Sequence, residues 1–331
     1  MPVAEFPALL ERFFTDRLVR QLGASQHTVA GYRDTFRLLL RFASQRLERA
    51  PSNLEFAQLD APFVAKFLDH LEHDRHNQTR TRNTRLAALR AFFRYVAVME
   101  PAHLLHCQRV LAIPGKRHER GPVEFLSEEE VTALVAAPDT ATWIGRRDHA
   151  LLLLSLQTGL RNSELRSLRG QDVQLGTGAH VRCLGKGRKM RCTPLRPDVV
   201  DVLTAWISRQ ACEPANHIFP SSRGTSLSSD ALQRLVARHA DSAAAKCPSL
   251  KGRTVTPHTL RHTAAMDLLR RGVDLSVIAL WLGHESTETT QIYLHADMKM
   301  KEQALAHASA SGVVPERFRP KDGLLAFLEG L

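Results

Sequence analysis

The stretch from residue 113 to residue 124 limits the possible fold of this chain more than any other feature, because it divides the sequence in two. It combines proline and glycine with closely spaced basic side chains: Pro114, Gly115, Lys116, Arg117, His118, Arg120, Gly121 and Pro122. Such a composition is typical of a linker rather than of a helix or a strand. With 331 residues, the chain is long enough for a separate core on each side. We therefore expect a domain at 1–112, a basic linker at 113–123, a second domain at 124–300 and a tail at 301–331.

The first of these domains shows the apolar periodicity of several helices. Apolar residues recur at helical spacing from Thr28 to Leu47, and again from Thr79 onward. Asp60 followed by Pro62 is typical of the start of another helix. The polar faces of the helix from Thr79 carry a set of arginines: Arg80, Arg82, Arg85, Arg90 and Arg94. An ordinary solvated surface is one interpretation, but few acidic residues accompany them, which favours contact with phosphates. The candidates for contact with a DNA backbone are Arg82, Arg85, Lys116 and Arg117.

The charge of the whole chain agrees with a polyanionic partner. Lys and Arg number 45 against 34 Asp and Glu, a net charge of +11. DNA or RNA is the usual partner of such a chain, although an incidental basic surface is the alternative. Five scattered cysteines without metal-type spacing, and no secretory signal, favour the reducing cytoplasm. If the polyanionic partner is DNA, the protein is expected to be associated with the nucleoid. The longest apolar run, near Ala150–Leu156, is too short to span a bilayer.

The second domain is expected to contain mainly helices and one β-hairpin. Ser127 begins a capping signature, and helices are predicted at Arg146–Leu156 and from about Asn162. Two short strands, His180–Leu184 and Met190–Leu195, are predicted to flank a glycine-rich turn.

The sequence HTLRH at residues 258–262 is the strongest local sign of chemistry. Thr256 is suited to be an N-cap and Pro257 to be the first helical residue. His258 and Arg261 would then share one face near the positive end of the helix, and would present a proton-transfer group and a guanidinium to one anion. His258 and His262 have the spacing of zinc ligands, but no Cys or acidic ligand is suitably placed. A structural histidine is a further alternative for His258.

Four other residues gain meaning only in combination. Arg161 in TGLRNSEL would alone suggest a capping or surface residue, and Lys186 in a GKG turn a solvated lysine. Glu164 is placed to orient a neighbouring histidine or arginine. Tyr293 is the only tyrosine after Tyr95, and a tyrosine becomes a useful nucleophile only when its proton is taken up and the charge of its target is neutralised.

Taken in order, Arg in TGLRNSEL, Lys in GKG, HTLRH, LGH and then Tyr nine residues on resemble the tyrosine recombinase (phage integrase) family. The resemblance is strong from about Phe125 to His295 and looser over the basic helical N-terminal segment. It implies a mainly α fold with a small antiparallel β-sheet. A helical, SAM-like core-binding domain and a tyrosine recombinase catalytic domain would together form a C-shaped clamp on DNA.

The resemblance also implies six catalytic residues: Arg161, Lys186, His258, Arg261, His284 and the nucleophile Tyr293. Tyr293 would attack the scissile phosphate, form a 3′-phosphotyrosyl adduct and release a 5′-hydroxyl. Arg161 and Arg261 would hold the non-bridging oxygens, and His284 would add a hydrogen bond.

Lys186 would be the general acid that protonates the leaving oxygen, and His258 the general base for the phenol. No metal and no other cofactor is required, because the cations are side chains and one phosphodiester is exchanged for another. The resemblance implies a site-specific recombinase or integrase that acts as a homotetramer on two synapsed sites in double-stranded DNA, with accessory DNA-bending proteins as further candidate partners.

Other classes share parts of this pattern. A type IB topoisomerase uses the same chemistry as a monomer, but the compact length and the LGH–Tyr spacing favour a recombinase. An inert DNA-binding protein would be expected to lack one of the six catalytic residues, and a metal-dependent nuclease would need an acidic cluster. In the tail, the apolar stretch Leu324–Leu328 would either pack on its own domain or dock into a neighbouring protomer.

Overall fold

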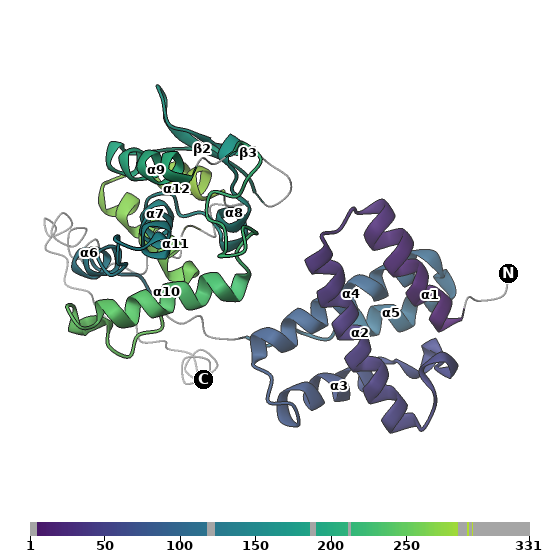
Figure 1. Ribbon diagram of the computed structural model, residues 1–331. Coiled ribbons are helices and arrows are strands. Elements are labelled where there is room, and N and C mark those ends of the chain that lie inside the picture. The colour runs from purple at the N-terminus through teal and green to yellow at the C-terminus, as the bar shows by residue number, and fades with distance from the viewer. Residues whose placement is uncertain are drawn as a thin grey trace, which may run out of the picture. The chain divides into compact units, whose positions relative to one another are not determined.

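The computed structural model describes residues 5–117, 123–185, 190–210 and 213–283, together with Thr290 and Tyr293. The chain forms two compact units, Met1–Gly121 and Pro122–Leu331, and each is described by itself. Both consist mainly of helices, and the second also contains a small antiparallel sheet (Figure 1). The mainly α fold with a small antiparallel sheet that the sequence predicts is therefore confirmed. No helix in the described ranges has the length and apolar character to cross a bilayer.

The regular elements among the described residues 5–117 of the first unit are all helices. Its longer helices are α1 (Phe6–Arg12), the π-helix η1 (Phe13–Gln21), α2 (Gln26–Leu47), α3 (Ala61–His73), α4 (Thr79–Met99) and α5 (Leu104–Leu111). Single 3-10 turns lie at η2 (Pro51–Asn53), η3 (Phe56–Gln58) and η4 (Pro101–His103). The helices predicted from Thr28, from Asp60 and from Thr79 are thus confirmed, and Asp60 caps α3 by accepting a hydrogen bond from the backbone N–H of Phe63.

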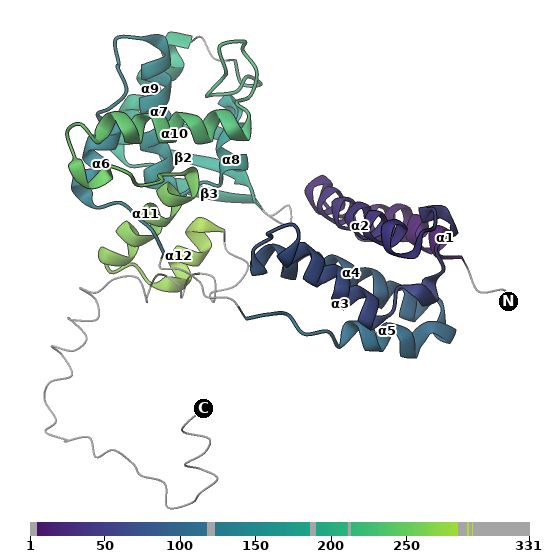
Figure 2. The same cartoon turned by 90° about the horizontal axis from the view of Figure 1, so that it is seen from below.

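Helix α4 organises the core of this unit. It packs against α2, α3 and α5, and its neighbours surround it in both views (Figure 2). The ring of Phe92 lies 5.4 Å from that of Phe13 and 5.2 Å from that of Phe36, with the rings edge to face. Aromatic pairs favour this geometry, so the contacts add to the free energy gained from burial of the rings.

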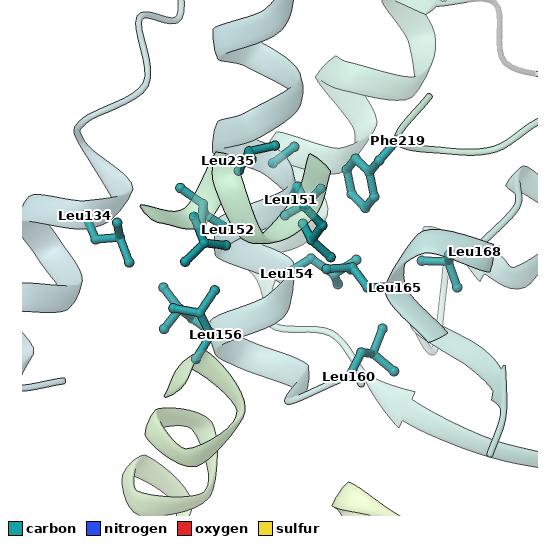
Figure 3. Close-up of a cluster of buried hydrophobic side chains, with 14 of the residues drawn as sticks. Leu134, Leu151, Leu152, Leu154, Leu156, Leu160, Leu165, Leu168, Phe219 and Leu235 are labelled. Atoms are coloured by element: carbon teal, nitrogen blue, oxygen red, sulfur yellow. The ribbon is translucent and has the colours of Figure 1, made fainter. Parts of the chain in front are cut away.

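In the second unit, other helices pack around the long helix α7 (Trp143–Thr158). Its other helices are α6 (Glu128–Val135), α8 (Asn162–Ser167), α9 (Pro197–Gln210), α10 (Ser229–Ala243), α11 (Pro257–Arg270) and α12 (Leu275–Leu282), with 3-10 turns at η5 (Gly170–Asp172) and η7 (Pro248–Leu250). Helix α7 packs against α6, α9 and α11. Its leucines, among them Leu151, Leu152 and Leu154, meet Leu165 and Phe219 in the buried cluster of Figure 3.

One antiparallel sheet lies at the edge of the second unit (Figure 1). Its strands β1 (Val173–Gln174), β2 (His180–Leu184) and β3 (Met190–Pro194) pair in chain order, with Cys183 opposite Arg191. The predicted hairpin is confirmed in its two strands. Strand β1 was not expected, because two residues are too short for an alternating pattern to be recognised.

Two glycines end helices beside each other in this unit. Gly159 ends α7 and Gly283 ends α12, both in the left-handed conformation, with φ of 61° and 66°. A side chain at Gly159 would place its Cβ only 2.5 Å from Cδ2 of Leu282. The two helix ends therefore touch, and their terminal carbonyls, which carry partial negative charge, come close to the same side chains.

Candidate active site

The HTLRH sequence lies in the first turns of helix α11, which begins where the capping pattern predicts. The Oγ1 atom of Thr256 accepts a hydrogen bond from the backbone N–H of Thr259, and Pro257 is the first helical residue. Arg261 follows one turn later and is buried, with 4% of its surface exposed. Its Nη1 donates to the carbonyl of Gly159 at 2.6 Å and its Nη2 to that of Leu282 at 2.7 Å. One guanidinium thus joins the ends of α7 and α12.

Arg161 is brought to the same helix ends by α8. It is the N-cap residue of α8, and its Nη2 donates to the carbonyl of Gly283 at 2.6 Å. Its Nη1 donates to Oε1 of Glu164 at 2.9 Å, and its backbone N–H to Oε2 at 2.8 Å. Glu164 therefore orients Arg161, one of the two roles that the sequence suggested for this carboxylate.

Strand β3 contributes a third guanidinium, from Arg191. Its Nη1 and Nη2 donate to the two carboxylate oxygens of Glu164 at 2.8 and 2.7 Å. Burial alone would raise the pKa of Glu164, but the hydrogen bonds from Arg191 and Arg161 outweigh it, and the pKa is lowered. Arg191 was not predicted as a site residue from the sequence. The signal available was its position five residues after Lys186, on a strand that leads back towards the core.

The three guanidiniums produce an excess of positive charge around one carboxylate. Burial, and then the positive charge of Arg161, lower the pKa of Arg261 to about 10, so Arg261 is still a cation at neutral pH. A guanidinium carries five N–H donors, and the two carbonyl bonds of Arg261 use only part of them. The arrangement is suited to hold an anion with several oxygens, such as a phosphate.

Tyr293 packs against α11 and α12 in the same unit, and its side chain is 1% exposed. Its hydroxyl lies 2.9 Å from Nδ1 of His262. Burial raises the pKa of the phenol, although the positive charge of Arg261 opposes the change. The phenol is therefore protonated at neutral pH and needs a proton acceptor before it can attack. The contact with His262 places such an acceptor beside it.

His258 lies next to His262, with ring centroids 4.1 Å apart. From the sequence, His262 was expected only as a candidate partner of His258 in a zinc site, and its contact with the phenol was not predicted. Within the described ranges, no group of three or more metal-ligating side chains is found. The spacing of i and i+4 on α11 had indicated that the two histidines are neighbours, but Tyr293 is 31 residues further on. Lys186 and His284 lie outside the described residues.

The phage integrase family matches residues 124–300, which include the whole cluster described above. The N-terminal SAM-like domain of phage integrases matches residues 10–98. This chain belongs to the phage integrase family. It is accordingly a tyrosine-type recombinase, as its sequence indicates.

Relatives of this recombinase match along almost its entire length. It is 53% identical over 328 residues to the integrase/recombinase y4rC of Sinorhizobium fredii, covering 99% of each chain. It is 32% identical over 306 residues to the tyrosine recombinase XerD of Pseudomonas putida, covering 89% of this chain and 94% of that one. Among solved structures, the XerH recombinase in a post-cleavage complex with difH DNA has a TM-score of 0.66 at 22% identity, covering 86% of this chain and 80% of that one. At this identity the structural likeness concerns the fold.

In the SAM-like domain of this recombinase, two of the candidate DNA contacts are engaged in the domain itself. Arg82 is 5% exposed, donates to the carbonyl of Pro114 at 3.1 Å and lies 3.8 Å from Glu72. Arg85 donates to Oγ1 of Thr35 at 3.1 Å. The acidic partner of Arg82 comes from α3 and cannot be seen in the sequence of α4.

The other two candidates, Lys116 and Arg117, are exposed, as are Arg80 and Arg94. Lys116 forms an ion pair with Glu72, and its backbone N–H and carbonyl bind the side-chain amide of Asn83 at 3.0 and 2.7 Å. The first residues of the predicted linker are thus attached to α4.

Proposed function

We propose that this recombinase cleaves and rejoins double-stranded DNA at specific sites through a covalent bond between Tyr293 and a 3′-phosphate. In the cleavage step the phenolic oxygen forms a bond to phosphorus, the bond to the 5′ oxygen breaks, and the phenol proton passes to a base. The observation that supports this most directly is the placement of one phenol, hydrogen-bonded to a histidine, in the same unit as the cluster of Arg161, Arg191 and Arg261.

Arg161 and Arg261 are proposed to hold the non-bridging oxygens of the scissile phosphate. Phosphoryl transfer spreads negative charge over these oxygens, and fixed cations in a site that excludes water stabilise that charge more strongly than water does. Both side chains are already oriented by bonds to the carbonyls of helix ends, so little reorganisation is required of them when the phosphate enters. His284 would add a hydrogen bond to the same phosphate.

The phenol proton is proposed to leave through the pair His258 and His262. The family resemblance assigns the role of base to His258, while the contact of 2.9 Å with the hydroxyl supports His262 as the group that first accepts the proton. Lys186 is proposed to protonate the leaving 5′ oxygen. In the reverse reaction, the 5′-hydroxyl of a partner strand attacks the phosphotyrosine and completes strand exchange.

The burial of Tyr293 implies that DNA binding is coupled to exposure of the phenol. A side chain that is 1% exposed cannot reach a phosphate on a duplex without movement of the chain around it. We infer that engagement of DNA releases Tyr293 from the apolar contacts of α11 and α12. Premature attack on unintended phosphates would thereby be limited.

The unit of action is proposed to be a homotetramer on two synapsed DNA sites in the cytoplasm. Exchange between two duplexes breaks four strands, and this chain has only one tyrosine after residue 95. Four protomers therefore supply one nucleophile for each strand. A type IB topoisomerase, which seals the same strand that it cuts, would need only one protomer, so the number of protomers per reaction distinguishes the two.

Covalent capture on DNA fragments from the source genome tests the function. The protein is mixed with the fragments in the presence of a chelator, denatured with detergent, and the DNA that stays attached is sequenced. We expect adducts at recurring sequence positions, linked through a 3′-phosphate and absent in Tyr293→Phe, which should still bind DNA. Adducts that persist in Tyr293→Phe, or a wild-type protein that forms none, would contradict the proposal.

A further inference from the structure

Arg191 is a buried cation of the site to which the proposed mechanism gives no role. Only 9% of its side chain is exposed, and 4% of that of its partner Glu164. The two parallel bonds between them form the bidentate geometry that gives guanidinium–carboxylate pairs their strength and direction. Burial would lower the pKa of Arg191, but the bond to Glu164 outweighs this effect and raises it. Both members of the pair are therefore ionised.

The charge of Glu164 matters because Arg161 binds the same carboxylate. Arg161 and Arg191 both donate to Oε1, at 2.9 and 2.8 Å. Without Arg191, the buried carboxylate would face Arg161 as its main partner. Its negative charge would then offset the positive charge that Arg161 is proposed to offer to the phosphate. With Arg191 in place, the negative charge of Glu164 is neutralised by a second guanidinium. Arg161 then remains oriented by Glu164 and keeps its positive charge available to the phosphate.

Arg191 also touches the turn that ends α12. A Cβ built on Gly283 would lie 2.7 Å from Nη1 of Arg191 and 3.2 Å from its Cδ, so the arginine lies directly against this glycine. The carbonyl of Gly283 in turn accepts the hydrogen bond from Nη2 of Arg161. One side chain on β3 thus contacts the acceptors of both side-chain hydrogen bonds of Arg161.

We propose that Arg191 is a positioning residue for DNA cleavage: it neutralises Glu164 and supports the Gly283 turn, and so keeps Arg161 aligned and charged for the scissile phosphate. The inference rests on the proposed cleavage by Tyr293. It assigns to β3 a role separate from that of Lys186, which precedes this strand in the sequence, because Arg191 is proposed to act through Arg161 rather than on the phosphate itself.

The test compares four variants of the full chain on a duplex that contains a site captured by the wild-type protein, nicked so that cleavage is irreversible. The variants are Arg191→Met, Arg191→Lys, Glu164→Gln with Arg191→Met, and the control Arg182→Met. Arg182 is an exposed arginine on the neighbouring strand that donates to the carbonyl of Gln171. The rate of adduct formation at saturating duplex and the affinity for the duplex are measured separately, and tryptophan fluorescence verifies that each variant is folded.

We expect Arg191→Met to form adducts about 10- to 100-fold more slowly, with unchanged affinity for the duplex. This is the range found when a residue that orients a metal-binding side chain is removed. Arg191→Lys should recover part of the rate, because it restores the charge without the paired bonds. Removing the charge of Glu164 in the double variant should also raise the rate above that of Arg191→Met. A purely structural role would not produce such a rescue, since the double variant lacks more native contacts.

Two results would overturn the inference while leaving DNA cleavage intact. One is an Arg191→Met variant that is folded and as fast as Arg182→Met. The other is a double variant that is as slow as Arg191→Met or slower, which would make the role of Arg191 one of packing. If the wild-type protein itself formed no adduct, the proposed function would fail and the inference with it.

Discussion

The Nδ1 atom of His262 lies 2.9 Å from the hydroxyl of Tyr293, so the phenol contacts the second histidine of HTLRH. An asparagine places its amide group where Nδ1 lies and can hold the phenol, but it is not a base at neutral pH. We expect His262→Asn to slow adduct formation about 100-fold, the lower end of the usual contribution of general base catalysis. The measurement is the rate with the nicked duplex as a function of pH.

The pH profile distinguishes the two histidines. A protonated imidazole accepts no proton, so the wild-type rate should fall as the pH is lowered. That fall should disappear in His262→Asn and persist, at a lower overall rate, in His258→Asn. The opposite pattern would show that His258 is the base. If His262→Asn reacts at the wild-type rate, His262 only orients the phenol.

Gly159 and Gly178 provide a matched pair for testing the contact between helix ends. Both have positive φ, 61° and 72°, but only Gly159 has a neighbour, Cδ2 of Leu282, within 2.5 Å of the position of a Cβ. Gly178→Ala should lower the free energy of unfolding by about 1 kcal/mol, because of the left-handed backbone alone. Gly159→Ala should cost about 3 kcal/mol, since overpacking is added.

Urea unfolding followed by tryptophan fluorescence measures these two costs. The three tryptophans, Trp143, Trp206 and Trp281, all lie after residue 122, so the fluorescence signal reports on the unfolding of the second unit. Gly159→Ala should also lose adduct formation, because the carbonyl of Gly159 holds Arg261. Equal costs for the two variants would show that the helix ends can separate without penalty.

The lowered pKa of Glu164 predicts how the stability of the catalytic unit depends on pH. A carboxylate whose pKa is depressed by folding stabilises the protein above its unfolded pKa, and that contribution is lost as the pH falls through the folded pKa. Glu164→Gln should therefore be about 3–5 kcal/mol less stable than the wild type at pH 7. The difference should shrink as the pH falls below the ordinary value of 4.5. Glu128→Gln, an exposed residue of α6, is the control and should show little difference at either pH.

Arg117 and Arg82 test the proposed DNA contacts of the N-terminal unit. Arg117 is exposed, whereas Arg82 is 5% exposed and bound to Pro114. If Arg117 contacts one phosphate, Arg117→Ala should weaken binding on all sequences and reduce the slope of log affinity against log salt by about 1.

Arg82→Met should leave that slope unchanged. It should instead lower the free energy of unfolding by about 1–3 kcal/mol, because the hydrogen bonds of this buried guanidinium to Pro114 and Asn83 are lost. Both effects are measured by titration of the captured duplex at several salt concentrations and by circular dichroism. A reduced slope in Arg82→Met would show that Arg82 leaves its internal partners to contact DNA.

Local patterns in the sequence were sufficient to predict several of the helices, the two hairpin strands and the family. Capping residues such as Asp60 and Thr256 act within one turn, and apolar periodicity marks the face that a helix buries, so α3, α4 and α11 could be predicted from short windows. The order of motifs from Arg161 to Tyr293 identified the family, because the resemblance depends on which residues follow one another along the chain and not on how they pack.

Only the tertiary structure decided which side chains meet. Arg191 binds Glu164 across 27 residues, Arg261 reaches Gly159 across 102, and His262 meets Tyr293 across 31. Such contacts depend on how buried surfaces pack, and no periodicity in the sequence encodes them. For the same reason the sequence of α4 did not reveal that Arg82 lies beside Glu72 of α3.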